Sequence, residues 1–203
     1  MHASHRPELK QAIIHASVEL GSLHGEEGLT MRAIAKRLGI SATALYQHFD
    51  SKAALLHKIR VYGHGVGQRE VTDVVASIDD PIERLRAWGQ AYVTFARSHS
   101  WLYSVLMEHE QIDFSKMSQE EMAGFLAPMI SVRDWLAEGQ ERGLIAASIE
   151  PLTSAMRIVT TMHGLCSLMN SGRVDENHPT APIRDLPAFI DDFIASIVDA
   201  LRA

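Results

Sequence analysis

The chain has 203 residues, of which 46% are hydrophobic and 22% are charged, and it contains one cysteine. This composition excludes collagen-like, disulfide-stabilised and intrinsically disordered proteins. The formal net charge of −6 argues against a protein that coats DNA regardless of sequence. There is no signal-peptide pattern and no apolar run of about 18 residues, so we expect a cytoplasmic protein with no membrane partner.

Apolar residues recur at steps of three and four along most of the chain, which predicts an all-α protein of about nine helices. The first predicted helix has an apolar stripe formed by Leu9, Ile13, Ala16, Leu20 and Leu23. It is expected to stop near Gly25 and Gly28, where glycines interrupt the pattern. Pro81 and Pro151 each stand at the first position of a later predicted helix.

Three helix starts crowd into residues 29–56. Thr30 and Ser41 are suited to cap the second and third helices, and Gly39 suits a left-handed helix stop between them. Because only residues 39–41 separate these helices, they must cross steeply, as in a helix-turn-helix. We therefore predict a three-helix helix-turn-helix domain over residues 1–50. A larger helical ligand-binding and dimerisation domain is expected over residues 51–203, with a fourth helix linking the two.

The third helix, expected over about residues 42–49, is too short to be stable alone, so Leu45 and Phe49 must dock it onto its neighbours. Its other face carries small, hydroxyl and amide side chains, which suit contact with base edges in DNA. These residues are Ala42, Thr43, Tyr46 and Gln47. The net charge of residues 1–60 is +3, whereas residues 61–203 carry −9, as expected if only the N-terminal part binds a polyanion.

Donors suited to phosphate groups surround this face. Thr30 and His48 add side-chain donors, and Lys52 stands at the amide end of the fourth helix, behind its cap Ser51. Arg32, in the first turn of the second helix, suits a guanine or a phosphate. The candidate DNA-binding residues are Thr30, Arg32, Ser41, Ala42, Thr43, Tyr46, Gln47, His48 and Lys52.

The sequence around these residues resembles the DNA-binding domain of the tetracycline-repressor (TetR) family over roughly residues 9–60. The matching motifs are Gly28-Leu29-Thr30-Met31-Arg32-Ala33-Ile34-Ala35, Leu38-Gly39-Ile40-Ser41, Leu45-Tyr46-Gln47-His48-Phe49, Ser51-Lys52 and Leu55-Leu56. Many members have Gly at the position of Thr43 and Thr at that of Ala44, so the operator sequence stays open. The resemblance implies a homodimer that binds double-stranded operator DNA, since two recognition helices read a palindrome.

The C-terminal region is rich in aromatic residues and methionine, which suit an adaptable cavity for an apolar small-molecule effector. We predict a ligand cavity where the stripe from Trp88 to Phe95 faces Met162 and Cys166. Tyr92 and His163 would supply its polar groups. The candidate ligand-binding residues are Trp88, Tyr92, Phe95, Trp101, Met107, Met122, Phe125, Met129, Met162, His163 and Cys166. The alternative for each is that it simply fills the helical core.

Two predicted helices, over residues 152–170 and 186–201, carry apolar residues on more than one side, which favours self-association. In the resembling family the corresponding helices form a four-helix bundle in the dimer. The run Thr161-Met162-His163-Gly164-Leu165, followed by Gly172-Arg173, resembles a C-terminal domain type named WHG, with methionine in place of tryptophan.

These patterns favour a homodimeric, ligand-responsive transcriptional regulator, most simply a repressor released by its effector. The alternatives are a helical protein-interaction module and a helical enzyme. No metal site, cofactor site or catalytic residue is predicted, because no two histidines lie four apart and no triad motif is present. The glycine-spaced run over residues 63–67 suits either a hinge or close helix packing.

Overall fold

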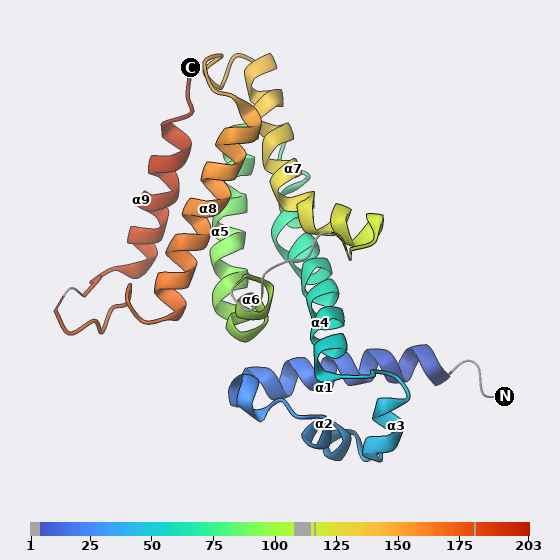
Figure 1. The fold of residues 1–203 in the computed structure, drawn as a ribbon. Helices are drawn as coiled ribbons and strands as arrows, with labels where there is room; N and C mark the ends of the chain where they lie inside the picture. The colour runs from blue at the N-terminus through green and yellow to red at the C-terminus, as the bar shows by residue number, and fades with distance from the viewer. Residues whose placement is uncertain (1–4, 108–114, 116, 181) are drawn as a thin grey trace. The chain divides into compact units, whose positions relative to one another are not determined.

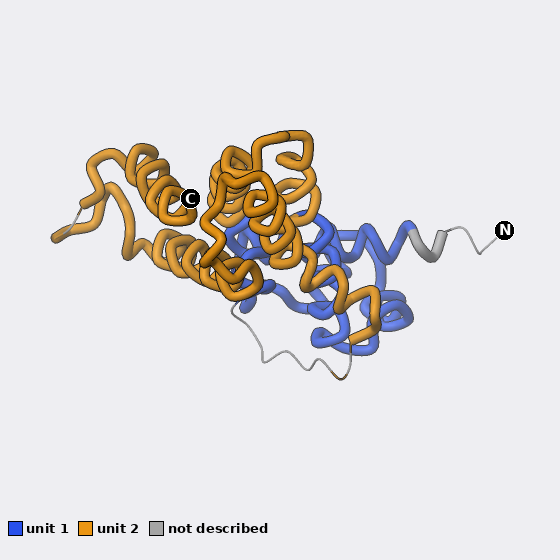
Figure 2. Tube along the Cα trace, turned by 90° about the horizontal axis from the view of Figure 1, so that it is seen from above, with its two compact units in different colours: residues 1–66, 99–113 blue, residues 67–98, 114–203 orange. Residues whose placement is uncertain are grey.

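The protein, represented by a computed structural model, is described over residues 5–107, 115, 117–180 and 182–203. This described part contains nine α-helices and no strand, which confirms the predicted fold class (Figure 1). Its residues form two compact units (Figure 2). Unit 1 comprises residues 1–66 and 99–113, and unit 2 comprises residues 67–98 and 114–203.

Unit 1 contains α1 (His5–Gly28), α2 (Met31–Leu38), α3 (Ala42–Tyr46), α6 (Ser100–Met107) and all but the last residue of α4 (Lys52–Gly67). The predicted N-caps are confirmed, since Thr30 Oγ1 accepts from Ala33 N at 3.1 Å and Ser41 Oγ from Ala44 N at 3.0 Å. The first helix leaves helical geometry where expected, at Gly25, which has φ 66°.

Gly39 ends α2 with φ 67°, a conformation that costs a glycine little. The next amide, that of Ile40, donates to the Ala35 carbonyl at 3.0 Å and closes the helix end. The third helix is shorter than predicted, because the chain turns at Gln47 and His48 before Ser51 caps α4. Three short helices thus follow one another with tight, individually capped connections.

Helix α6 packs into unit 1 at positions where glycine leaves room. A Cβ placed on Gly21 of α1 would overlap the Trp101 indole ring. A Cβ on Gly63 of α4 would lie 3.0 Å from Leu102 and 3.1 Å from Leu106. Close helix packing is therefore present at Gly63, one of the two roles predicted for the glycine-spaced run, while a hinge there stays a prediction.

Unit 2 contains the π-helix η1 (Gln68–Thr72), the 3-10 helix η2 (Asp73–Val75), α5 (Pro81–Ser98), α7 (Gln119–Glu141), α8 (Pro151–Asn170) and α9 (Leu186–Asp199). Pro81 and Pro151 open α5 and α8 as predicted, behind the acidic caps Asp80 and Glu150. Helix α5 packs against α7, α8 and α9 and carries the core of the unit. None of the described helices is long and apolar enough to cross a membrane.

Candidate nucleic-acid interface and effector region

The short helix α3 separates its side chains into a buried and an exposed set. Leu45 is fully buried and Phe49, just beyond the helix, is 5% exposed. Thr43 and Gln47 are exposed and Tyr46 is 49% exposed, although large aromatic side chains are usually buried. The two docking residues therefore hold a polar, sterically open face in solvent, the surface that base readout requires.

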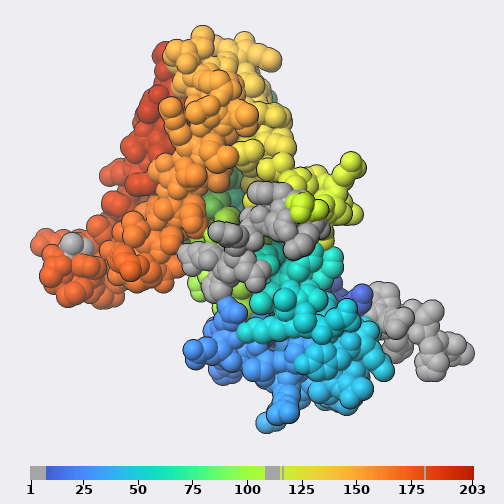
Figure 3. All heavy atoms as spheres, in the orientation of Figure 1, coloured from blue at the N-terminus to red at the C-terminus, as the bar shows by residue number. Residues whose placement is uncertain are grey.

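The remaining candidate DNA-binding residues surround this face with mixed accessibility. Thr30, Arg32 and Ser41 are exposed at the starts of α2 and α3, and Ala42 is half-buried. His48 is half-buried, and its Nδ1 is enclosed without a hydrogen-bond partner. The candidates therefore share one short stretch of unit 1, within the part drawn in blue to cyan in Figure 3, and several of their polar groups are accessible.

Lys52 has protein partners already. Its Nζ donates to the backbone carbonyl of Glu26 at 3.1 Å and lies 3.4 Å from Glu26 Oε1. Both side chains are more than one-third exposed, so the ion pair itself is weak. The lysine therefore ties the start of α4 to the end of α1, and a DNA phosphate would compete with Glu26 for its charge.

Salt-dependent binding separates these two roles of Lys52. If Lys52 contacts a phosphate, Lys52→Met makes the negative slope of the log association constant against log salt concentration shallower by about 1. In that case Glu26→Gln strengthens DNA binding. If Lys52 only ties the helices together, both variants weaken binding with an unchanged slope. We expect the first result, measured by fluorescence anisotropy on one promoter fragment over a salt series.

The predicted effector residues of α5 and α8 lie in the core of unit 2. Trp88, Tyr92, Met162 and Cys166 are all at most 5% exposed, and the Trp88 and Tyr92 rings are 5.1 Å apart. The void that Trp88 and Met162 line together measures only about 10 Å³. This volume holds about one water molecule, whereas drug-sized ligands occupy roughly 300–1,000 Å³.

The other predicted effector residues are distributed over both units. Trp101 and Met107 belong to α6 of unit 1, where Trp101 lies against α1 and Met107 is 42% exposed. The remaining ones are in unit 2, where Phe95 is buried. The half-buried members of this group are Met122, Phe125, Met129 and His163.

A larger open groove lies between α5 and α9, with a volume of about 350 Å³. It is lined by Gln90, Val93, Thr94, Arg97, Ser98, Pro187, Ile190 and Asp191. None of these residues was among the sequence candidates, because polar side chains at helical spacing resemble an ordinary solvent-facing surface.

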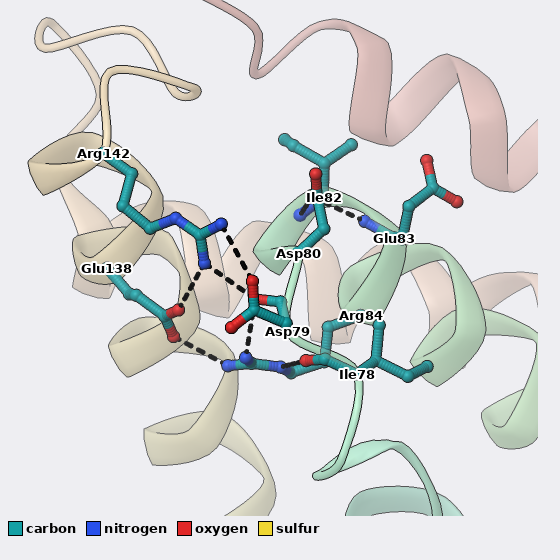
Figure 4. Close-up of polar contacts among 8 residues, drawn as sticks. All are labelled: Ile78, Asp79, Asp80, Ile82, Glu83, Arg84, Glu138 and Arg142. Carbon is teal, nitrogen blue, oxygen red and sulfur yellow. Dashed lines mark hydrogen bonds and ion pairs between the residues drawn. The ribbon is translucent and has the colours of Figure 1, made fainter.

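A buried arginine network joins the loop before α5 to α7 (Figure 4). Arg84, which is 9% exposed, donates Nε to the Ile78 carbonyl at 2.6 Å and Nη2 to the Asp79 carbonyl at 3.1 Å. Its Nη1 donates to Glu138 Oε2 at 2.7 Å, and Arg142 Nη1 donates to Glu138 Oε1 at 3.1 Å.

The hydrogen bond from Arg84 holds the pKa of Glu138 below its ordinary value, with Arg142 adding to the effect. The guanidinium of Arg84 also lies 5.7 Å from the centroid of the Trp135 ring. The network was not predicted, although one signal in the sequence could have identified it, because Arg84 falls at helical spacing in the same stripe as Trp88. A charge in an apolar stripe requires partners when it is buried.

Two tightly connected helices with an exposed polar face on the second, joined to a separate helical unit, define a helix-turn-helix transcriptional regulator. Residues 13–59 match the family model for bacterial regulatory proteins of the tetR family. Residues 85–197 match the model for the tetracyclin repressor-like C-terminal domain. The chain belongs to the TetR family.

Individual relatives agree with this assignment. The nucleoid occlusion factor SlmA of Vibrio vulnificus (strain YJ016) is 27% identical over 107 residues, 53% of each chain. The tetracycline repressor protein class C of Escherichia coli is 49% identical over 47 residues, which are 23% of this chain and 22% of that protein. The chain thus spans about half the length of the first curated relatives it matches.

Solved structures share the fold along nearly the whole chain. A protein of unknown function from Rhodococcus sp. RHA1 superposes with a TM-score of 0.79 at 20% identity, covering 100% of both chains. AibR in complex with isovaleryl coenzyme A and operator DNA superposes with a TM-score of 0.66 at 18% identity, covering 95% of this chain and 97% of that chain.

Proposed function

We propose that this protein is a homodimeric, ligand-responsive transcriptional repressor of the cytoplasm that binds a palindromic operator and is released by a small molecule. Residues 1–50 would form the DNA-binding domain and residues 51–203 the regulatory domain. The observation that carries the proposal is the exposed polar face of α3, which two buried residues hold open to solvent. A helical protein-interaction module would have no use for small and hydroxyl side chains on that face.

Mobility shift on promoter DNA over a salt series tests this proposal. We expect specific binding that weakens as salt rises, because each phosphate contact releases counterions. Non-specific binding should be weak, because the protein carries a net negative charge. Absence of salt-dependent binding to every candidate promoter would remove the regulator function. A small molecule that binds the regulatory domain should weaken operator binding, and operator DNA should weaken its binding equally.

Base readout is proposed for Thr43 and Gln47. Gln47→Ala should weaken binding to the preferred operator by about 1–3 kcal/mol and relax the preference at one base pair. Thr43→Ala should also change the preferred sequence, which selection from a randomised DNA pool would reveal. A uniform loss of affinity across all sequences from both variants would instead show that α3 contacts only the DNA backbone.

The proposed dimer interface lies on α8 and α9. On α8, Leu152, Met156 and Leu168 are 47%, 49% and 43% exposed, high values for large apolar side chains. On α9, Phe189 and Phe193 are half-buried with ring centroids 6.1 Å apart. A second copy of the chain would cover these side chains, as the family resemblance implies.

Met156→Asp should convert the dimer into a monomer at micromolar concentration, because an unpaired carboxylate buried in an apolar interface costs several kcal/mol. Size-exclusion chromatography with light scattering would measure the change. The matched control is Leu23→Asp, which places the same charge at an exposed apolar position of α1, outside the proposed interface. A wild-type protein that is monomeric at this concentration would contradict the dimer.

The effector is proposed to be a largely apolar molecule that binds in the C-terminal region. The candidate residues of α5 and α8, Trp88, Tyr92, Phe95, Met162, His163 and Cys166, would line its site after the core opens, since the present void is too small. The void's size implies that effector binding and conformational change are coupled. The WHG resemblance of this region stays a prediction.

A further inference from the structure

Two buried oxygen atoms lie without hydrogen-bond partners on the π-helix η1 (Gln68–Thr72). They are Gln68 Oε1 and Thr72 Oγ1, and the Thr72 residue as a whole is only 4% exposed. Buried polar atoms nearly always have a hydrogen-bond partner, so two buried oxygens without partners within one helical turn require an explanation. Single π-helical turns are rare and occur frequently at functional sites.

The orientation of the Gln68 amide is determined by its neighbour. Gln68 Nε2 donates to Asp73 Oδ1 at 2.8 Å. Because a carboxylate only accepts hydrogen bonds, the amide nitrogen must face Asp73 and the amide oxygen must face the interior. Thr72 follows Gln68 by four residues, about one turn, so both oxygens occupy the same side of the helix. That side therefore offers one obligate acceptor and one hydroxyl.

Two helices that carry residues predicted from the sequence to bind the effector surround these oxygens. Helix η1 packs against α5 and α7. Phe95 of α5 lies beside its start, since a Cβ on Gly67 would be 3.8 Å from Phe95 Cζ. The two oxygens thus form a polar spot next to aromatic and apolar side chains, the usual composition of a small-molecule site.

We propose that Gln68 Oε1 and Thr72 Oγ1 bind the polar end of the effector, and that the effector is an apolar molecule bearing an N–H or O–H donor. This inference rests on the proposed effector response. Gln68 Oε1 can only accept, so a molecule that presents acceptors alone, such as an ester or a carboxylate, gains no hydrogen bond from it. The proposal thus specifies that the effector carries a hydrogen-bond donor at its polar end.

Matched probe pairs test the inference by isothermal titration calorimetry. The pairs are p-cresol with 4-methylanisole and indole with 1-methylindole, in which methylation removes the donor. We expect wild-type protein to bind the donor member of a pair about tenfold more tightly than its methylated partner, the effect of one hydrogen bond of about 1.4 kcal/mol. Because a single donor bonds mainly to one of the two oxygens, the preference should fall to less than about threefold in at least one of Thr72→Val and Gln68→Met.

Thr94→Val is the matched control, because Thr94 is exposed on α5 and its hydroxyl already donates to the Gln90 carbonyl at 2.9 Å. It should leave the donor preference unchanged. Thr72→Val should also raise the midpoint of thermal unfolding without probe, since it removes an unpaired buried hydroxyl. No probe binding, equal affinity within each pair, a preference that survives in both variants, or a lowered unfolding midpoint for Thr72→Val would each overturn the inference.

Operator binding is measured separately, on promoter DNA without probe. Suppose that wild-type protein and Thr72→Val both bind this DNA while no donor preference appears. Then Gln68 and Thr72 do not bind the polar end of the effector, and the proposed regulator function is unaffected. If wild-type protein binds no DNA, the proposed function is wrong, whereas a donor preference in calorimetry would still identify Gln68 and Thr72 as a binding site.

Discussion

Gly21→Ala is expected to destabilise the protein by about 1–3 kcal/mol or more, the range for overpacked cores. Gly21 is buried in α1, and an added Cβ would overlap the indole ring of Trp101 on α6. The ring is rigid and only 9% exposed, so it cannot turn aside as a long flexible side chain would. Thermal unfolding followed by circular dichroism should show a midpoint lower by roughly 3–10 °C.

Gly124→Ala provides a matched control for this substitution. Gly124 lies within α7, and an added Cβ there would meet no atom within 4 Å. The change should raise stability by up to about 1 kcal/mol, because alanine favours the helix more than glycine does. Combining Gly21→Ala with Trp101→Leu should recover part of the lost stability, since the two positions share one space. An unchanged midpoint in Gly21→Ala would contradict the packing of α6 on α1.

Arg84→Met is expected to cost about 2–4 kcal/mol, a large effect for one substitution. The change removes the donors for two backbone carbonyls and leaves the Glu138 carboxylate with Arg142 as its remaining partner. Methionine keeps most of the packing against Trp135, so the loss reports mainly on hydrogen bonds and charge. Denaturant unfolding with a constant m-value would measure it.

The control for this prediction is Arg133→Met. Arg133 pairs with its neighbour Asp134 on the exposed side of α7, with side chains 40% and 58% exposed. Such surface pairs contribute about 0–1 kcal/mol. A similar cost at Arg84 and Arg133 would show that the network contributes no more than a surface ion pair.

The same network predicts a pH dependence. Because the pKa of Glu138 is lowered in the folded protein, its ionised form stabilises the fold at pH values above the unfolded-state pKa. This contribution is lost as the pH falls through the lowered, folded-state pKa. Glu138→Gln should therefore reduce stability near neutral pH and make the acid decline shallower. A parallel decline in both proteins would contradict this role of Glu138.

Local structure near the recognition helix was predictable because short-range interactions determine it. The caps at Thr30 and Ser41 and the left-handed stop at Gly39 each depend on a few adjacent residues. The same holds for the division of α3 into buried Leu45 and exposed Thr43, which follows from helical periodicity. The end of α3 was predicted less well, because the chain turns at Gln47 and His48 and the predicted helix was too long.

The effector region was less predictable, because composition cannot distinguish a core from a cavity. Trp88 and Met162 do line one void, as the spacing suggested, but close packing reduces it to about 10 Å³. Trp101 has the same aromatic character, yet it packs against Gly21, eighty positions away in sequence. Only the fold determines which of these side chains become neighbours.

By itself, the sequence determined the fold class, the family and the order of the capped helices, because each depends on neighbouring residues or on local periodicity. The tertiary structure alone decided that Lys52 meets Glu26, that Arg84 joins the loop before α5 to Glu138, and that Gln68 and Thr72 bury unpaired oxygens. Such contacts depend on how distant segments pack and on which polar groups that packing encloses, and helical periodicity carries no information about either.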